Sequence, residues 1–121
     1  MRTLAACLLC LLASIASHAG ELVILQYHFV DAARPASTSV SPEQFEAHLR
    51  VIEEEGYVVV DLPIALDALA DDDALPERAV AITFDDGYAS VHREAFPRLA
   101  ARAWPFTVFV NPEPIDAGSP L

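Results

Sequence analysis

Short apolar runs that alternate with helix-like segments constrain the fold of this chain more than any other feature. The runs expected to be strands are Leu22–Leu25, Tyr57–Val60, Ala79–Phe84 and Phe106–Val110. Strands that alternate with helices form parallel sheets, whose functional groups gather at the carboxyl ends of the strands. The pattern therefore predicts an α/β fold, and the 121 residues leave no room for a second independent core.

The helix after the first strand has the clearest sequence signature. Ser41 is a capping residue, Pro42 suits the first helical position, and Gln44 can bond back to the cap. Apolar residues then recur at helical spacing, at Phe45, Leu49 and Ile52. Gly56 fits the left-handed position that commonly follows a helix. The pattern predicts an amphipathic helix from residue 42 to just before Gly56.

Two further helices are expected between the later strands. Residues 64–69 and 89–103 have helical composition, and Pro97 should kink or break the second segment because proline lacks a backbone N–H. The acidic run at residues 71–73 is expected to be a solvated loop. The aromatic residues of the later strands are assigned to the core: Phe84, Phe106 and Phe109.

The first 19 residues have the composition of a secretory signal peptide. Arg2 is their only charged residue, an apolar run extends from Leu4 to Ala16, and small residues stand at Ser17 and Ala19. The apolar run is shorter than the ~20 residues that a spanning helix needs. We expect cleavage after Ala19, export to the periplasm or the cell exterior, and only transient membrane contact.

Charge and cysteine content limit the chemistry of the mature chain, residues 20–121. Both cysteines, Cys7 and Cys10, lie in the signal segment, so any metal must be held by oxygen and nitrogen. Without that segment six arginines stand against 18 acidic residues, a net charge of −12. This balance argues against nucleic acid as a partner and suits a neutral or cationic substrate such as an amino-sugar polymer. Solubility alone also accounts for exposed acidic residues.

The segment Asp85-Asp86-Gly87 directly follows the strand expected at residues 79–84. Two neighbouring carboxylates could divide the work of amide hydrolysis, since one can bind a cation while the other takes a proton from water. Gly87 would allow a tight backbone turn beneath them. An ordinary turn is the alternative, because aspartate and glycine are favoured turn residues.

The wider sequence resembles the polysaccharide deacetylase family, carbohydrate esterase family 4. Its first motif is matched by the hexapeptide at residues 83–88, Thr-Phe-Asp-Asp-Gly-Tyr. Further segments that resemble the family occur before and after this motif, in the same order as in the family: residues 24–30, 41–45, 55–57, 75–80, 96–99 and 104–107. The resemblance implies an incomplete, distorted (β/α) barrel of the deacetylase type. The stretch at residues 75–88 looks like enzymes that act on poly-N-acetylglucosamine, and chitin-like polymers and peptidoglycan stay open as substrates.

The resemblance also implies roles for individual residues. Asp85 would be the general base, and Asp86 would bind a divalent metal, usually zinc, in a hydrolase that removes N-acetyl groups from an amino-sugar polysaccharide. Apart from the resemblance, His28 at the end of the first strand is expected to face the same pocket and to pack or contact substrate rather than to bind metal, and Tyr88 is expected either to line the substrate cleft or to lie in the core. The family completes its metal site with two histidines of a later His-Ser/Thr-x-x-His motif, and nothing after Phe109 matches it. We therefore expect residues 20–121 to be the N-terminal part of a truncated domain with an exposed apolar face.

Two other functions remain open at this stage. A catalytically inactive fragment, or a carbohydrate-binding or interaction module, could keep the scaffold without the metal histidines. A phosphoacceptor domain also uses paired aspartates and a divalent cation, but the signal segment and the absence of lysine from the chain argue against it.

Overall fold

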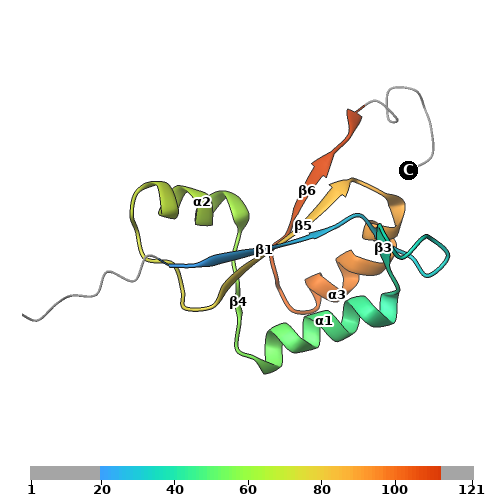
Figure 1. The fold of residues 1–121 in the computed structure, drawn as a ribbon, viewed down its shortest axis with the longest axis horizontal. Helices are drawn as coiled ribbons and strands as arrows, with labels where there is room; N and C mark the ends of the chain where they lie inside the picture. The colour runs from blue at the N-terminus through green and yellow to red at the C-terminus, as the bar shows by residue number, and fades with distance from the viewer. Residues whose placement is uncertain (1–19, 113–121) are drawn as a thin grey trace, which may run out of the picture.

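The computed structural model describes residues 20–112 (Figure 1). The strands are β1 (Leu22–Tyr27), β2 (Phe29–Val30), β3 (Ser39–Val40), β4 (Val58–Val59), β5 (Ala79–Asp86) and β6 (Thr107–Val110). The helical segments are α1 (Pro42–Glu54), α2 (Leu62–Ala70), the π-helix η1 (Val91–Ala95) and α3 (Phe96–Ala100). The predicted signal peptide, residues 1–19, lies outside the described residues. Within residues 20–112, none of the helices has the length and apolar character needed to span a membrane.

The main sheet is parallel and is built around β5. Along one edge, β1 pairs with β5 from Leu22 opposite Ala79 to Tyr27 opposite Phe84. Along the other edge, β4 pairs with the beginning of β5 and β6 pairs with its end. The predicted alternation of strands and helices is confirmed, and the arrangement is that of part of a distorted (β/α) barrel.

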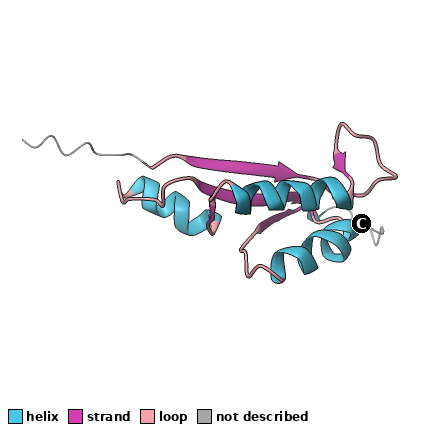
Figure 2. Ribbon diagram, turned by 90° about the horizontal axis from the view of Figure 1, so that it is seen from below, coloured by secondary structure: helices cyan, strands magenta, loops and turns pink. Residues whose placement is uncertain are grey.

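The core fills the space between this sheet and the helices α1, η1 and α3. Figure 2 shows α1 and α3 on the same side of the sheet. The predicted apolar stripe of α1 is buried there together with alternate residues of β5: Phe45, Leu49 and Ile52 against Val80, Ile82 and Phe84. Burying each of these large side chains contributes about 1.5–3 kcal/mol, so this layer holds β5 in place.

Local sequence signals fix the ends of the helices. Ser41 and Gln44 form the predicted capping box of α1, and Gly56 has a φ of 70° just after its end. The helix α2 begins two residues earlier than expected because the Asp61 side chain accepts a hydrogen bond from the Ile64 N–H and caps it. The predicted break at Pro97 is a change from a π-helix to an α-helix, with Pro97 in the first turn of α3, where its missing N–H costs little.

One pairing was not anticipated from the sequence and one expectation needs correction. On either side of the polar stretch that contains Pro35, β2 and β3 pair as a short parallel ribbon. Phe109, assigned to the core, is 53% exposed, because β6 is an outer strand and Phe109 lies opposite Asp85 at the open end of the sheet. Phe84 is fully buried and Phe106 packs against the core, as predicted.

Candidate active site

The two neighbouring aspartates end the central strand. The strand β5 runs through Asp85 and Asp86, and the backbone then turns sharply, with φ angles of 66° at Asp86 and 74° at Gly87. The Gly87 N–H donates to the Asp85 carbonyl oxygen at 2.9 Å, which closes the turn. Aspartate and glycine tolerate this left-handed conformation better than most residues. Both carboxylates therefore stand at the carboxyl end of β5, where parallel sheets place their functional groups.

Side chains from the end of β1 and from the residue just beyond it contact one side of the Asp85 carboxylate. The Gln26 side-chain amide donates a hydrogen bond to Asp85 Oδ2. The Nε2 atom of His28 lies 3.6 Å from the same oxygen. The Asp85 side chain keeps 22% of its surface exposed, so it is held from one side and open on another. A partly open carboxylate of this kind can accept a proton from a water molecule.

Different groups contact the second aspartate. A hydrogen bond with Asp86 raises the pKa of the Tyr88 phenol. The Tyr88 ring stacks on Phe29 with ring centroids 3.7 Å apart, and the Arg34 guanidinium lies 4.7 Å from the centroid of Phe29. The ribbon formed by β2 and β3 thus supports the Tyr88 ring and, through its phenol, the carboxylate of Asp86.

A small cavity of about 190 Å³ adjoins this cluster. Its walls come from the end of β1 and from the β2–β3 ribbon, and they include Gln26 and His28, both of which contact Asp85. The hydroxyl-bearing residues at positions 37–39 also line it. The cavity therefore offers polar groups beside the candidate base.

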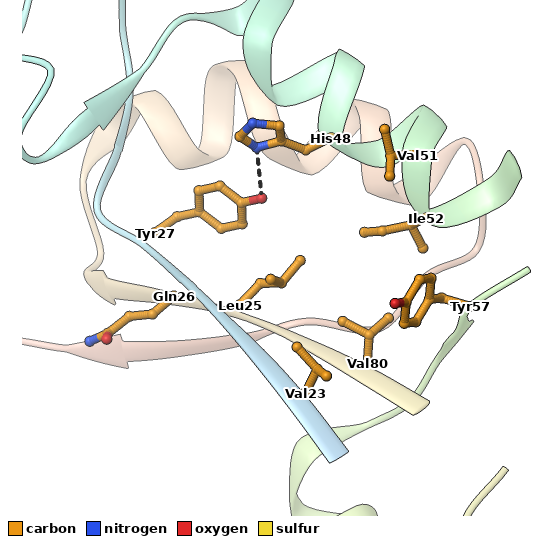
Figure 3. Close-up of a pocket in the computed structure, with 9 residues that line it drawn as sticks. All are labelled: Val23, Leu25, Gln26, Tyr27, His48, Val51, Ile52, Tyr57 and Val80. Atoms are coloured by element: carbon orange, nitrogen blue, oxygen red, sulfur yellow. Dashed lines mark hydrogen bonds between the residues drawn. The ribbon is translucent and has the colours of Figure 1, made fainter. Parts of the chain in front are cut away.

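A larger, mostly apolar cavity of about 440 Å³ lies between β1 and α1 (Figure 3). Figure 3 shows the Tyr27 hydroxyl directed at His48 Nδ1, at a distance of 3.1 Å, whereas the Gln26 amide extends away from the helix. Successive side chains of a strand point to opposite faces. Tyr27 thus faces the core, whereas its neighbours Gln26 and His28 face Asp85. The larger cavity is not lined by Asp85 or Asp86, and Gln26 borders both this cavity and the carboxylate site.

The residues around Asp85 and Asp86 do not supply enough ligands for a metal ion. No group of three or more histidine, cysteine, aspartate and glutamate side chains within residues 20–112 is arranged to hold a metal ion. Asp86 is of the right chemical type for one ligand, but a catalytic zinc takes about three protein ligands. The described residues alone therefore do not fit a complete zinc site.

The four residues singled out from the sequence lie at one end of the sheet: Asp85, Asp86, His28 and Tyr88. Their catalytic roles stay predictions. Sequence reasoning missed Gln26 and Phe29, which contact Asp85 and Tyr88. For Gln26 a signal was present, because it stands two positions before His28 and so faces the same side of β1.

Comparison with known proteins connects this arrangement to enzymes. A sequence profile described as polysaccharide deacetylase matches residues 72–120, which include the Asp85–Asp86 pair. YxkH of Bacillus subtilis (strain 168) is 33% identical over 90 residues, which cover 74% of this chain and 32% of YxkH. The poly-β-1,6-N-acetyl-D-glucosamine N-deacetylase of Escherichia coli (strain K12) is 35% identical over 85 residues, or 69% of this chain and 13% of that protein.

A solved structure agrees with these sequence matches. IcaB from Ammonifex degensii superposes with a TM-score of 0.65 at 39% identity, covering 74% of this chain and 37% of that one. The chain thus spans about a third of the length of YxkH and of the solved IcaB chain. The profile match at residues 72–120 includes β5, the strand that ends in Asp85 and Asp86.

Proposed function

The chain belongs to the polysaccharide deacetylase family, and from this premise we propose that it carries the general base and the first metal ligand of an N-acetyl hydrolase. The proposed substrate is an extracytoplasmic amino-sugar polysaccharide. The observation that carries this proposal is the pairing of Asp85 and Asp86 at the end of β5, with each carboxylate contacted by different groups. Adjacent acids with different partners can take different roles.

Asp85 is the proposed base. Its carboxylate is partly exposed and is held on one oxygen by Gln26, which leaves it able to accept a proton from the attacking water. The same group can then return the proton to the amine that leaves when the amide bond breaks. His28 lies 3.6 Å from Asp85, so it would contact an acetamido group bound beside this carboxylate.

Asp86 is the proposed metal ligand. A bound divalent ion such as zinc supplies the Lewis acidity that polarises an amide carbonyl and acidifies water. The Tyr88 phenol holds the Asp86 carboxylate in place for this role. The other ligands would have to come from outside residues 20–112, because the described residues do not complete a site.

The substrate and the location are supported by features of the chain and by one relative. The E. coli relative is named for N-deacetylation of poly-β-1,6-N-acetyl-D-glucosamine. The mature chain carries a net charge of −12, which suits the cationic amino groups that deacetylation creates. Residues 1–19 have signal-peptide composition, and we therefore infer export of the protein.

Acetate release by the complete gene product from a poly-N-acetylglucosamine oligomer tests the proposal. Asp85→Asn should abolish release and leave zinc affinity largely unchanged, whereas Asp86→Asn should weaken zinc binding itself. Asp67→Asn, in α2, is the matched control and should leave both quantities unchanged. Activity that survives both site variants would remove the proposal. Tight glycan binding without any acetate release would instead favour a binding module.

A further inference from the structure

We propose that Gln26 is a positioning residue for the base: its side-chain amide fixes the orientation of the Asp85 carboxylate. This inference rests on the proposed function and adds to it a residue that lies outside the Asp85–Asp86 motif. The two residues are 59 positions apart in the sequence, and the pairing of β1 with β5 brings them together.

The chemistry of the contact decides which way the amide faces. An ionised carboxylate only accepts hydrogen bonds, so the Gln26 nitrogen, and not its oxygen, must face Asp85. The structure has this arrangement, with Nε2 donating to Oδ2. His28 approaches the same oxygen, at 3.6 Å. Both contacts engage Oδ2, which leaves Oδ1 as the oxygen that would accept the proton of the attacking water.

An amide donor suits a general base better than a cation would. A hydrogen bond to a charged group is strong enough to restrict rotation of the carboxylate. An amide carries no net charge, so it orients the base without neutralising it, whereas a lysine or arginine would form an ion pair. Gln26 therefore restricts rotation of the Asp85 carboxylate without pairing it with a cation.

The fold itself does not depend on this contact. The strands β1 and β5 are already joined by a continuous ladder from Leu22 to Tyr27. The Thr83 hydroxyl also donates to the Leu25 carbonyl oxygen at 3.1 Å, which adds a partly buried link between the same strands. The side chain of Gln26 is exposed and is not part of the apolar core. The contact of Gln26 with Asp85 is therefore better explained by a role in orienting the carboxylate than by a role in folding.

Kinetics of the complete gene product with zinc test this role. Gln26→Leu removes the amide at similar size, Gln26→Asn keeps an amide on a shorter side chain, and Ile24→Val changes the same face of β1 as a control. We expect Gln26→Leu to lower kcat roughly 10- to 100-fold, since small misplacements of catalytic groups have effects of this size. KM, zinc affinity and the thermal midpoint should stay unchanged, and Gln26→Asn should recover part of kcat.

The possible outcomes separate this inference from the proposed function. If the parent protein releases acetate and Gln26→Leu keeps the parental kcat, the positioning role is wrong and the proposed function stands. A Gln26→Leu variant that loses stability, zinc affinity and kcat together would assign Gln26 a structural role and also overturn the inference. A parent protein that releases no acetate would remove both proposals.

Discussion

The ring of Tyr88 stacks on Phe29 with centroids 3.7 Å apart and ring planes inclined by 21°. The phenol of the same tyrosine is hydrogen-bonded to Asp86. A residue of the β2–β3 ribbon thus fixes a side chain that in turn holds the candidate metal ligand. Groups that orient metal ligands through such outer contacts strongly affect metal affinity.

Removal of the Tyr88 phenol should therefore weaken metal binding without unfolding the protein. We expect Tyr88→Phe to keep the stack on Phe29 and to lower the zinc affinity of the complete gene product by about tenfold. Competition with a chromophoric chelator measures the change. Tyr57→Phe is the matched control, because Tyr57 lies beside Arg78 at the other end of the sheet. Equal zinc affinity in Tyr88→Phe and the parent would show that the phenol does not position Asp86.

Burial of Tyr27 predicts a loss of stability in alkali. Burial raises the pKa of the Tyr27 phenol from 10.0 to about 12. The folded-state pKa is higher than the unfolded-state pKa. The stabilisation that the protonated Tyr27 contributes to the folded protein is therefore fully present below pH 10, and it is lost as the pH rises from 10 to 12. Urea unfolding across this range should show a smaller alkaline loss for Tyr27→Phe than for the parent. An identical pH dependence in both proteins would contradict the assignment to Tyr27.

The lowered pKa of Glu46 predicts a loss of stability in acid. Its hydrogen bond with Arg102, at 2.6 Å, lowers the pKa of Glu46 below 4.5. The stabilisation is therefore present above pH 4.5 and is lost as the pH falls through the folded-state pKa. Glu46→Gln should cost about 1 kcal/mol at neutral pH, and the difference from the parent should vanish in strong acid. Glu54→Gln, on the same helix, is the control for loss of an acidic side chain, and a cost that does not depend on pH would refute the prediction.

The open side of the sheet predicts self-association of isolated residues 20–121. Within residues 20–112, β1 pairs with β5 alone, and apolar side chains such as Ile24 and Phe109 are about half exposed. Free strand edges and apolar patches promote aggregation. We expect oligomers in light scattering and strong binding of an apolar dye, both reduced by Ile24→Lys. Ile64→Lys, on the exposed face of α2, should have little effect. A monomer that melts cooperatively and binds little dye would show that this surface is not a hazard.

Much of the fold followed from local sequence signals. The apolar runs marked the four strands of the main sheet, and the Ser41 capping box and Gly56 marked the ends of α1. The β2–β3 ribbon was missed because each of its strands has only two residues. Its pairing is reinforced by the Ser39 hydroxyl, which donates to the Asp31 carbonyl oxygen at 2.6 Å, and no periodicity in the sequence reveals such a contact.

The candidate site was predictable in its motif but not in its surroundings. Asp85 and Asp86 were found because carboxylates that follow a buried strand form a local pattern. The contacts of Gln26 with Asp85 and of Phe29 with Tyr88 join residues 59 positions apart in each case. Such pairs depend on strand register, which is set by packing of the whole sheet. The position of Phe109 depends on register in the same way, since it lies opposite Asp85.

The central claim is that the aspartates at the end of β5 share one metal-assisted site, and a zinc-edge anomalous map of the complete gene product tests it most directly. The account predicts one zinc peak about 2.1 Å from a carboxylate oxygen of Asp86, with Asp85 near the zinc but not bound to it. A zinc peak whose ligands exclude Asp86, or carboxylates of Asp85 and Asp86 that both turn away from the zinc, would contradict the account.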